Sequence, residues 1–240
     1  MDAKRISGHP AERRWGAGGR VVPRKWVLPD GYRPNKETLS NAPLDFSARM
    51  HGLIADVCSR CPAFAHVNPA ALAVTFTPSR NRSKYGLQAR VTPLRFPAGA
   101  VHRQYRGRTF QIQRFVFQGS DLLYLVTFCL PRFLDRPFED KLTTVFHELF
   151  HIAPAFDGDL RRLGGRYSYH SRSKCAYDDY ARTLAQEYRL AHSDPDVFAF
   201  LRFSYKELWN AYGGIQGVVL PKPKLLPVVA ESAAPAARFA

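Results

Sequence analysis

The sequence predicts an α+β domain in which a small mixed sheet packs on a long amphipathic helix. Four strand-like runs lie between residues 72 and 130, and the last of them is almost wholly apolar. After Pro131 the apolar residues instead recur with a period of about 3.6, which indicates a helix. Further helical segments follow toward residue 212. We therefore expect one globular body whose sheet precedes its principal helices in the chain.

The length and composition suit a single domain with an extension at each end, since 45% of the 240 residues are hydrophobic. Residues 1–40 mix Arg, Gly and Pro and offer two large apolar anchors, Trp15 and Trp26. We expect them to form a basic disordered tail, residues 41–215 to form the domain, and the Pro/Ala-rich residues 216–240 to form a second disordered tail.

Nothing in the apolar pattern indicates a membrane segment. The sequence has no stretch of about 18 uncharged apolar residues, and its first 20 residues lack the apolar run of a signal peptide. We therefore expect a soluble cytoplasmic protein with no membrane partner. The sequence does not indicate an oligomeric state.

The four cysteines are too few for the disulfide framework of a small secreted domain, so we expect reduced thiols. Cys58 and Cys61 form a CxxC, which is half of a zinc-ribbon pattern. Cys129 and Cys175 lie far apart and supply no second pair. Two thiols on one helix is therefore the favoured interpretation of the CxxC.

The first element of the domain is a helix over residues 43–61, which Asp45 can cap and Pro62 ends. Its apolar positions recur at helical spacing: Phe46, Met50, Leu53, Ile54 and Val57. The four strand-like runs that follow are 72–77, 87–96, 108–117 and 122–130. The middle two alternate apolar residues with Arg or Gln, as half-exposed strands do, whereas the last should lie centrally.

The principal helix is expected to begin after Pro131, with Asp135 as its cap and Pro137 in its first turn. Its apolar stripe follows the i, i+3, i+4, i+7, i+8 pattern: Leu142, Val145, Phe146, Leu149 and Phe150. A second helix should cover about 177–191, and a shorter one about 195–212 that ends at Gly213-Gly214.

The principal helix carries the sequence HELFH at residues 147–151. Because His147 and His151 are four residues apart, they lie about one turn from each other on one face, where two imidazoles can bind one metal ion. At about 100° per residue both project away from the apolar stripe, so the stripe can enter the core while the histidines face a cleft. The sequence therefore predicts a catalytic Zn2+ site. Two solvated histidines on an amphipathic helix are the structural alternative.

Glu148 lies beside the first histidine but off the shared face, so it is expected to act on water rather than to bind the metal. As general base it would take a proton from the water that zinc activates and pass it to the leaving amine. The predicted reaction is the hydrolysis of peptide bonds in a protein or peptide substrate.

The third metal ligand is expected from the segment after the motif, since catalytic zinc uses three protein ligands and one open position. His170 is the first choice, because the turn-rich DGD and LGG segments can bring the chain back to the metal. Asp157 is the alternative, although Pro154 stands where a short-spaced turn would use glycine. Asp157 and Asp159 can equally shape the turn or orient a histidine.

Charge that develops during hydrolysis also needs a donor. Spacing does not choose among five nearby candidates: Arg161, Arg162, Tyr167, Tyr169 and Tyr177.

The formal net charge of +15 is unevenly distributed, because residues 78–114 contain nine Arg or Lys residues and no acid. Such a field attracts polyanions, so nucleic acid is a candidate partner of this region. Solvation of exposed strands is the structural alternative. The second functional hypothesis is therefore a basic DNA-binding or accessory protein with a structural or vestigial metal site. A zinc hydrolase acting on a non-protein amide is the third.

Residues 144–178 resemble the family of phage metallopeptidases, which are zincins of phages, prophages and bacteria. The resemblance rests on HELFHIAP, FDGDLRR and GGR together with the later His170 and Tyr177-Asp178, and it extends back through FTPSRNRSKYGLQARVTPLRF. It covers most of residues 43–195 and implies a zincin-like metallopeptidase domain with C-terminal helices beside the HExxH helix.

The order of HExxH and a histidine some 20 residues later is also similar to SprT-like proteases, which act on proteins crosslinked to DNA. That likeness implies action on nucleic-acid-associated proteins. The sequence departs from the SprT pattern because it lacks a paired-cysteine zinc ribbon and because Ser171, not glycine, follows His170.

Overall fold

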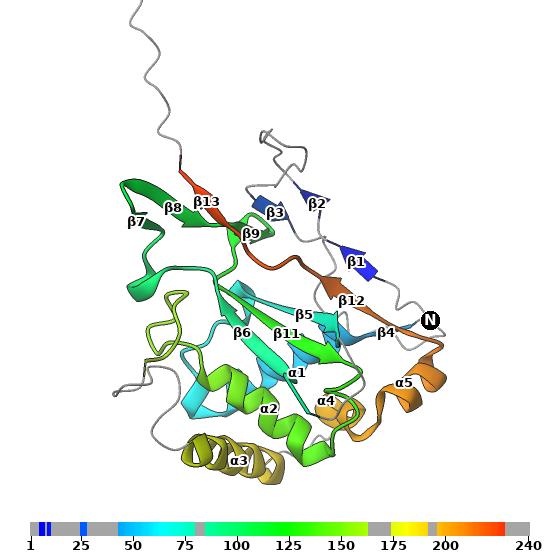
Figure 1. Cartoon of the computed structure of the whole chain (residues 1–240). Helices are drawn as coiled ribbons and strands as arrows, with labels where there is room; N and C mark the ends of the chain where they lie inside the picture. The colour runs from blue at the N-terminus through cyan, green and yellow to red at the C-terminus, as the bar shows by residue number, and fades with distance from the viewer. Residues whose placement is uncertain are drawn as a thin grey trace, which may run out of the picture.

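The structure is a computed structural model with the mixed α+β organisation that the sequence predicts (Figure 1). It describes residues 43–79, 85–162, 174–191 and 196–228, apart from the side chains of 174–176. It also describes the backbone of three short strands between residues 5 and 27.

The central sheet contains three strands in the order β5 (Leu72–Pro78), β11 (Tyr124–Leu130) and β6 (Ala89–Pro93). β11 runs parallel to β5 and antiparallel to β6, so the sheet is mixed. The nearly continuous apolar run of β11 predicts its central place, which the structure confirms.

Two helices, α1 (Phe46–Arg60) and α2 (Phe138–Phe150), cover one face of this sheet, and a third, α3 (Lys174–Ala191), lies against α2 on the side away from the sheet (Figure 1). α1 packs on β5, and Asp45 caps it by accepting a 2.8 Å hydrogen bond from the amide of Ala48. α2 packs on β6, and four members of its predicted stripe, Leu142, Val145, Phe146 and Leu149, are fully buried, whereas the fifth, Phe150, is half-buried. The stripe thus fixes α2 against the sheet and leaves its other face toward α3.

Two predicted helix boundaries are wrong. Asp135 does not cap α2, which starts after Pro137 without a side-chain cap; Asp135 instead accepts a hydrogen bond from the Tyr205 amide. The single helix expected over 195–212 is divided into α4 (Asp196–Ala199), a 3-10 turn (Phe200–Arg202) and α5 (Tyr205–Tyr212). The division arises because Ser204 and Glu207 form a capping box that starts a new helix.

The run expected as one strand over 108–117 forms two strands in different sheets. The chain changes sheets at Gln113, whose amide donates to Lys224 O at 2.8 Å while its side chain accepts from the Lys224 amide at 3.3 Å. β8 (Arg108–Ile112) lies between β7 (His102–Tyr105) and β13 (Leu225–Pro227), and we call this three-stranded sheet the ribbon. β9 (Arg114–Phe117) instead joins β10 (Ser120–Asp121).

Both predicted tails contain strands. In the N-terminal 40 residues, β1 (Arg5–Ser7) pairs with β12 (Ile215–Val219), and β12 also pairs with β4 (Leu44–Asp45). From the same N-terminal part, β3 (Lys25–Val27) pairs with β9 on one side and with β2 (His9–Pro10) on the other. At the other end, the boundary at residue 216 is corrected, because Val218 of β12 is buried and β13 belongs to the ribbon. Backbone pairing therefore recruits segments whose composition alone does not predict a core.

In the described part of the chain, no helix is long and apolar enough to cross a membrane.

Candidate metal centre

The two motif histidines face each other at the C-terminal end of α2. Their Nε2 atoms are 3.1 Å apart, and their ring centroids are 4.8 Å apart. Two ligands of one tetrahedral zinc ion would lie about 3.3 Å apart, given Zn–N bonds of about 2.0–2.1 Å. The observed separation of His147 and His151 therefore fits a shared metal ion, which the helical spacing predicts.

Asp178 of α3 fixes how His147 presents its ring. Its Oδ1 lies 2.9 Å from His147 Nδ1. A carboxylate can only accept here, so the neutral imidazole carries its proton on Nδ1 and directs the Nε2 lone pair at His151. Metal-binding histidines commonly have such a carboxylate partner on the other nitrogen. The pairing therefore supports a ligand role for His147.

The Tyr177 ring packs against both imidazoles. Its ring stacks on His151 with centroids 5.2 Å apart and meets the His147 and Phe150 rings edge to face. Its hydroxyl donates a 3.3 Å hydrogen bond to His147 O. Burial raises the pKa of Tyr177, and the nearby Glu148 raises it further, so the hydroxyl stays protonated. Tyr177, one of the predicted oxyanion donors, is thus placed to hold the histidines.

Glu148 is buried and points toward the central sheet. Its Oε2 accepts a 2.8 Å hydrogen bond from the amide of Val91 on β6. Burial raises the pKa of Glu148 to about 7, and the hydrogen bond from Val91 opposes part of this shift. A carboxyl group of this kind can both accept and release a proton near neutral pH.

The amide that Glu148 contacts belongs to the outer side of β6. Cys129 N donates to Gln88 O, and Leu94 N donates to Leu123 O, so the even-numbered residues of this segment face β11. The N–H and C=O of Val91 therefore point away from β11. Within the described residues β6 lies at the edge of the central sheet, so Glu148 lies beside an outward-facing strand edge.

The described residues supply two of the expected metal ligands. His170, the predicted third ligand, lies outside them and stays a prediction. In the ranges that are described, no group of three or more His, Cys, Asp or Glu side chains is placed to hold a metal ion. Asp157, the alternative, is therefore not brought together with His147 and His151.

Asp157 and Asp159 shape the turn after the motif, which was the structural interpretation of the DGD sequence. Asp157 Oδ1 accepts from the Asp159 amide at 3.0 Å, and Asp159 Oδ2 accepts from the Ala98 amide at 3.0 Å. Gly158 between them has φ +89°, and its amide donates to the hydroxyl of Tyr124. The turn is thus anchored to β11 and guides the chain away from α2.

Arg161 is the described oxyanion candidate with the least engaged side chain. Its guanidinium lies 4.1 Å from the Phe150 ring centroid, and its buried Nε has no hydrogen-bond partner among the described residues. Arg162 instead forms an ion pair with Asp159. Tyr167 and Tyr169 lie outside the described residues. Arg161 therefore brings a charge beside the aromatic residues that support the histidines.

Sequence reasoning did not assign roles to Asp178 or Val91. Asp178 lies on a different helix from His147, and the spacing of the two residues carries no signal of contact. Val91 contributes its backbone amide, which no side-chain pattern can indicate. A carboxylate partner for a metal-binding histidine is nevertheless a general expectation that directs attention to acids on neighbouring elements.

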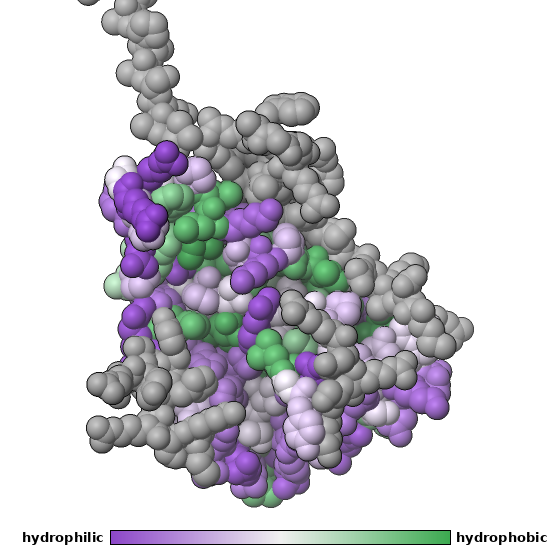
Figure 2. Space-filling view, viewed as in Figure 1, coloured by the Kyte–Doolittle hydropathy of each residue, from purple (hydrophilic) through white to green (hydrophobic). Residues whose placement is uncertain are grey.

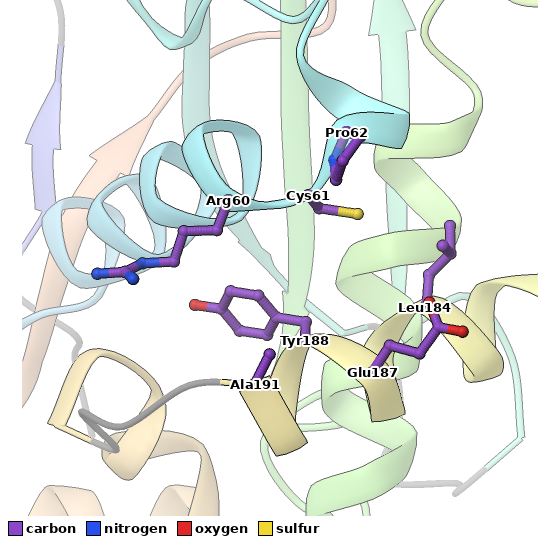
Figure 3. Close-up of a pocket in the computed structure, with 7 residues that line it drawn as sticks. All are labelled: Arg60, Cys61, Pro62, Leu184, Glu187, Tyr188 and Ala191. Carbon is purple, nitrogen blue, oxygen red and sulfur yellow. The ribbon is translucent and has the colours of Figure 1, made fainter.

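The CxxC thiols lie apart from the histidines, at the end of α1. Cys58, Cys61 and Cys129 are free and buried, and burial raises the pKa of the Cys58 thiol to about 12. Cys61 lines a pocket of about 380 Å³ together with Tyr188 and Glu187 of α3, and Figure 3 shows how these side chains lie. Cys58 lies on α1 and Cys61 is its C-cap residue, so the two thiols belong to one helix as expected.

Comparisons of the chain with protein-family models, with curated proteins and with solved structures find no match.

Proposed function

We propose that the protein is a zinc-dependent metallopeptidase with a zincin-like domain. The observation that carries the proposal is the approach of His147 Nε2 to His151 Nε2 at 3.1 Å, with Asp178 on the remaining nitrogen of His147. His147 and His151 would supply two nitrogen ligands to a zinc ion, with the Asp178 carboxylate orienting the first of them. In this proposal His147, His151 and His170 hold the zinc ion.

When bound, zinc supplies Lewis acidity that polarises a peptide carbonyl and acidifies water. Glu148 acts as general base, taking a proton from the attacking water and delivering it to the leaving amine. Its burial keeps bulk water from competing for the carboxylate. Arg161 contributes positive charge near the site and is the preferred candidate to stabilise the anionic transition state.

The substrate is proposed to lie along β6 as an extended chain. The outward-facing N–H and C=O of Val91 are available for backbone pairing once the Glu148 carboxylate turns to the reacting water. Pairing with an edge strand holds a peptide straight without demanding particular side chains. The proposed substrate is therefore an unfolded segment or a flexible loop of a protein.

Zinc content and hydrolysis of unrelated denatured proteins test the proposal together. His147→Ala and His170→Ala should lose zinc and activity, whereas Glu148→Gln should keep zinc and lose hydrolysis. His102→Ala, at an exposed position on β7, is the matched control and should change neither. Full hydrolysis by Glu148→Gln would remove Glu148 from the mechanism, and zinc-free wild type would remove the metal centre.

The alternative is a basic nucleic-acid-binding or accessory protein in which the metal is structural or vestigial. It is favoured by cations of β6 and β8 that have no acidic partner among the described residues. It predicts salt-sensitive nucleic-acid binding by a zinc-loaded protein that cuts none of the denatured proteins. Cleavage of small amides alone would instead indicate a zinc amidase.

A further inference from the structure

A basic, hydroxyl-lined cavity lies on the face of the central sheet opposite α2. Its volume is about 180 Å³, and it is lined by Arg90, Lys222 and three threonines, Thr77, Thr92 and Thr127, with only Leu and Pro besides. Successive side chains of a strand point to opposite faces, so Arg90 and Thr92 point away from the face on which Val91 packs toward α2. The cavity is thus separated from the histidines by the sheet.

The chemistry of the cavity suits an oxyanion. Two cations supply charge, and the threonine hydroxyls can donate hydrogen bonds without adding charge of their own. Thr127 is already oriented by a 2.9 Å hydrogen bond to the hydroxyl of Thr75. No Asp or Glu lines the cavity. A tetrahedral phosphate group would therefore find donors on several sides and no opposing charge.

The two cations of the cavity form no ion pair with an Asp or Glu among the described residues, whereas seven other arginines do. Arg60, Arg95, Arg114, Arg136, Arg162, Arg182 and Arg189 each form an ion pair with an Asp or Glu. Among the described residues no such pair includes Arg90 or Lys222. Their charge is therefore available to a ligand.

The basic surface continues from the cavity onto the ribbon. Lys222 and Lys224 lie in the segment between β12 and β13, which crosses toward β8 in Figure 1. From Lys222 through β13 to Pro227 the chain spans at most about 17 Å, which is comparable to the axial rise of a few bases in a stacked helical strand at 3.4 Å each. The surface therefore has the dimensions of a short run of nucleotides.

The ribbon itself combines cations with an exposed aromatic ring. Its register places Arg103, Tyr105 and Arg108 on one face, and Tyr105 is 56% exposed. Arg106 at the turn lies over the Tyr105 ring at 5.3 Å. Figure 2 shows hydrophilic residues gathered over β7 and β8 beside a hydrophobic patch. Proteins that bind single-stranded nucleic acids combine cations that contact the phosphates with aromatic rings that stack on the bases.

We propose that this face binds the phosphodiester backbone of a nucleic acid. One phosphate occupies the cavity between Arg90 and Lys222, and the following phosphates contact Arg103, Arg106 and Arg108 of the ribbon. The proposal does not depend on peptidase activity, because the cavity and the histidines lie on opposite faces of the sheet.

The test is fluorescence anisotropy of the full chain with a labelled 20-nucleotide single strand, its duplex and poly-glutamate over a series of salt concentrations. Arg90→Gln/Lys222→Gln should weaken nucleic-acid binding about tenfold or more and reduce the slope of log K against log salt by about 1.4 for the single strand and about 1.8 for the duplex. Arg103→Gln/Arg108→Gln, at exposed positions that do not enter the core, should reduce the slope similarly. Poly-glutamate should bind much more weakly than either oligonucleotide.

Arg49→Gln/Lys206→Gln is the matched control, because it removes the same charge from exposed positions on α1 and α5. It should leave the slope unchanged. An equal loss in this control would reduce the effect to net charge and overturn the proposal. So would equal affinity for poly-glutamate, or the absence of salt-dependent binding to both oligonucleotides.

Discussion

The pairing of Asp178 with His147 leads to a quantitative prediction about zinc affinity. Asp178→Ala removes the carboxylate 2.9 Å from Nδ1, so the imidazole can rotate and can place its proton on either nitrogen. Losing such a partner typically weakens metal binding about 10–100-fold. Because the Asp178 side chain is 36% exposed, water can partly replace it, and we expect the lower end, about tenfold. That factor corresponds to about 1.4 kcal/mol.

Competition titration against a chromophoric zinc chelator at fixed pH measures this effect. Asp178→Asn should lose less than Asp178→Ala, because the amide oxygen can still accept from Nδ1–H. Asp179→Ala is the matched control, since Asp179 is the next residue on α3 and pairs with Arg182 instead. Wild-type affinity in Asp178→Ala, or an equal loss in Asp179→Ala, would refute the assignment of Asp178 as the partner that orients His147.

Three further predictions concern stability and reactivity. Burial lowers the pKa of Lys141 to about 8, so the folded state binds fewer protons than the unfolded state between pH 8 and about 10.5. The free-energy cost of burying the charged Lys141 is therefore present below pH 8 and is relieved as pH rises. In chemical denaturation, the free energy of unfolding of the wild type should rise by up to about 3 kcal/mol across this range relative to that of Lys141→Met. Parallel pH profiles of the two proteins would disprove this prediction. Gly158→Ala should destabilise by about 1–3 kcal/mol more than Gly107→Ala, because a Cβ at Gly158 would meet Arg95 Cγ at 2.5 Å whereas Gly107 has open space, and both have positive φ. Equal thermal shifts would mean that Arg95 moves aside freely. Cys58, with a thiol pKa of about 12, should resist iodoacetamide at pH 8 until the protein unfolds, and rapid labelling of the native protein by mass spectrometry would contradict its burial.

Local patterns predicted the elements that position the site. The apolar stripe of α2 placed its four core residues, and the four-residue spacing placed both histidines on the remaining face. The apolar run of β11 indicated its central place in the sheet. In each case the pattern within one segment contained the information, because burial selects apolar residues at the positions of that segment that face the core.

Contacts between distant segments could not be predicted in this way. Asp135 has the residue type of a helix cap, yet it serves α5, because the loop before α2 lies against that helix. The break at Gln113 depends on Lys224, more than a hundred residues later. The contacts of Glu148 and His147 with Val91 and Asp178 likewise depend on how whole elements pack. The Pro/Ala-rich composition of the C-terminal residues also did not predict β12. A short run of residues can form a strand there because its backbone groups pair with those of a neighbouring strand.

The alternation of β6 separates the two proposed activities. Val91 offers its outward amide to Glu148, whereas Arg90 and Thr92 point into the cavity on the other face. Glu148→Gln should therefore abolish hydrolysis without changing the salt dependence of nucleic-acid binding. Arg90→Gln/Lys222→Gln should weaken nucleic-acid binding without changing hydrolysis of a free denatured protein. Loss of both activities in either variant, with the thermal stability retained, would show that the two faces act as one site and that the sheet does not insulate them.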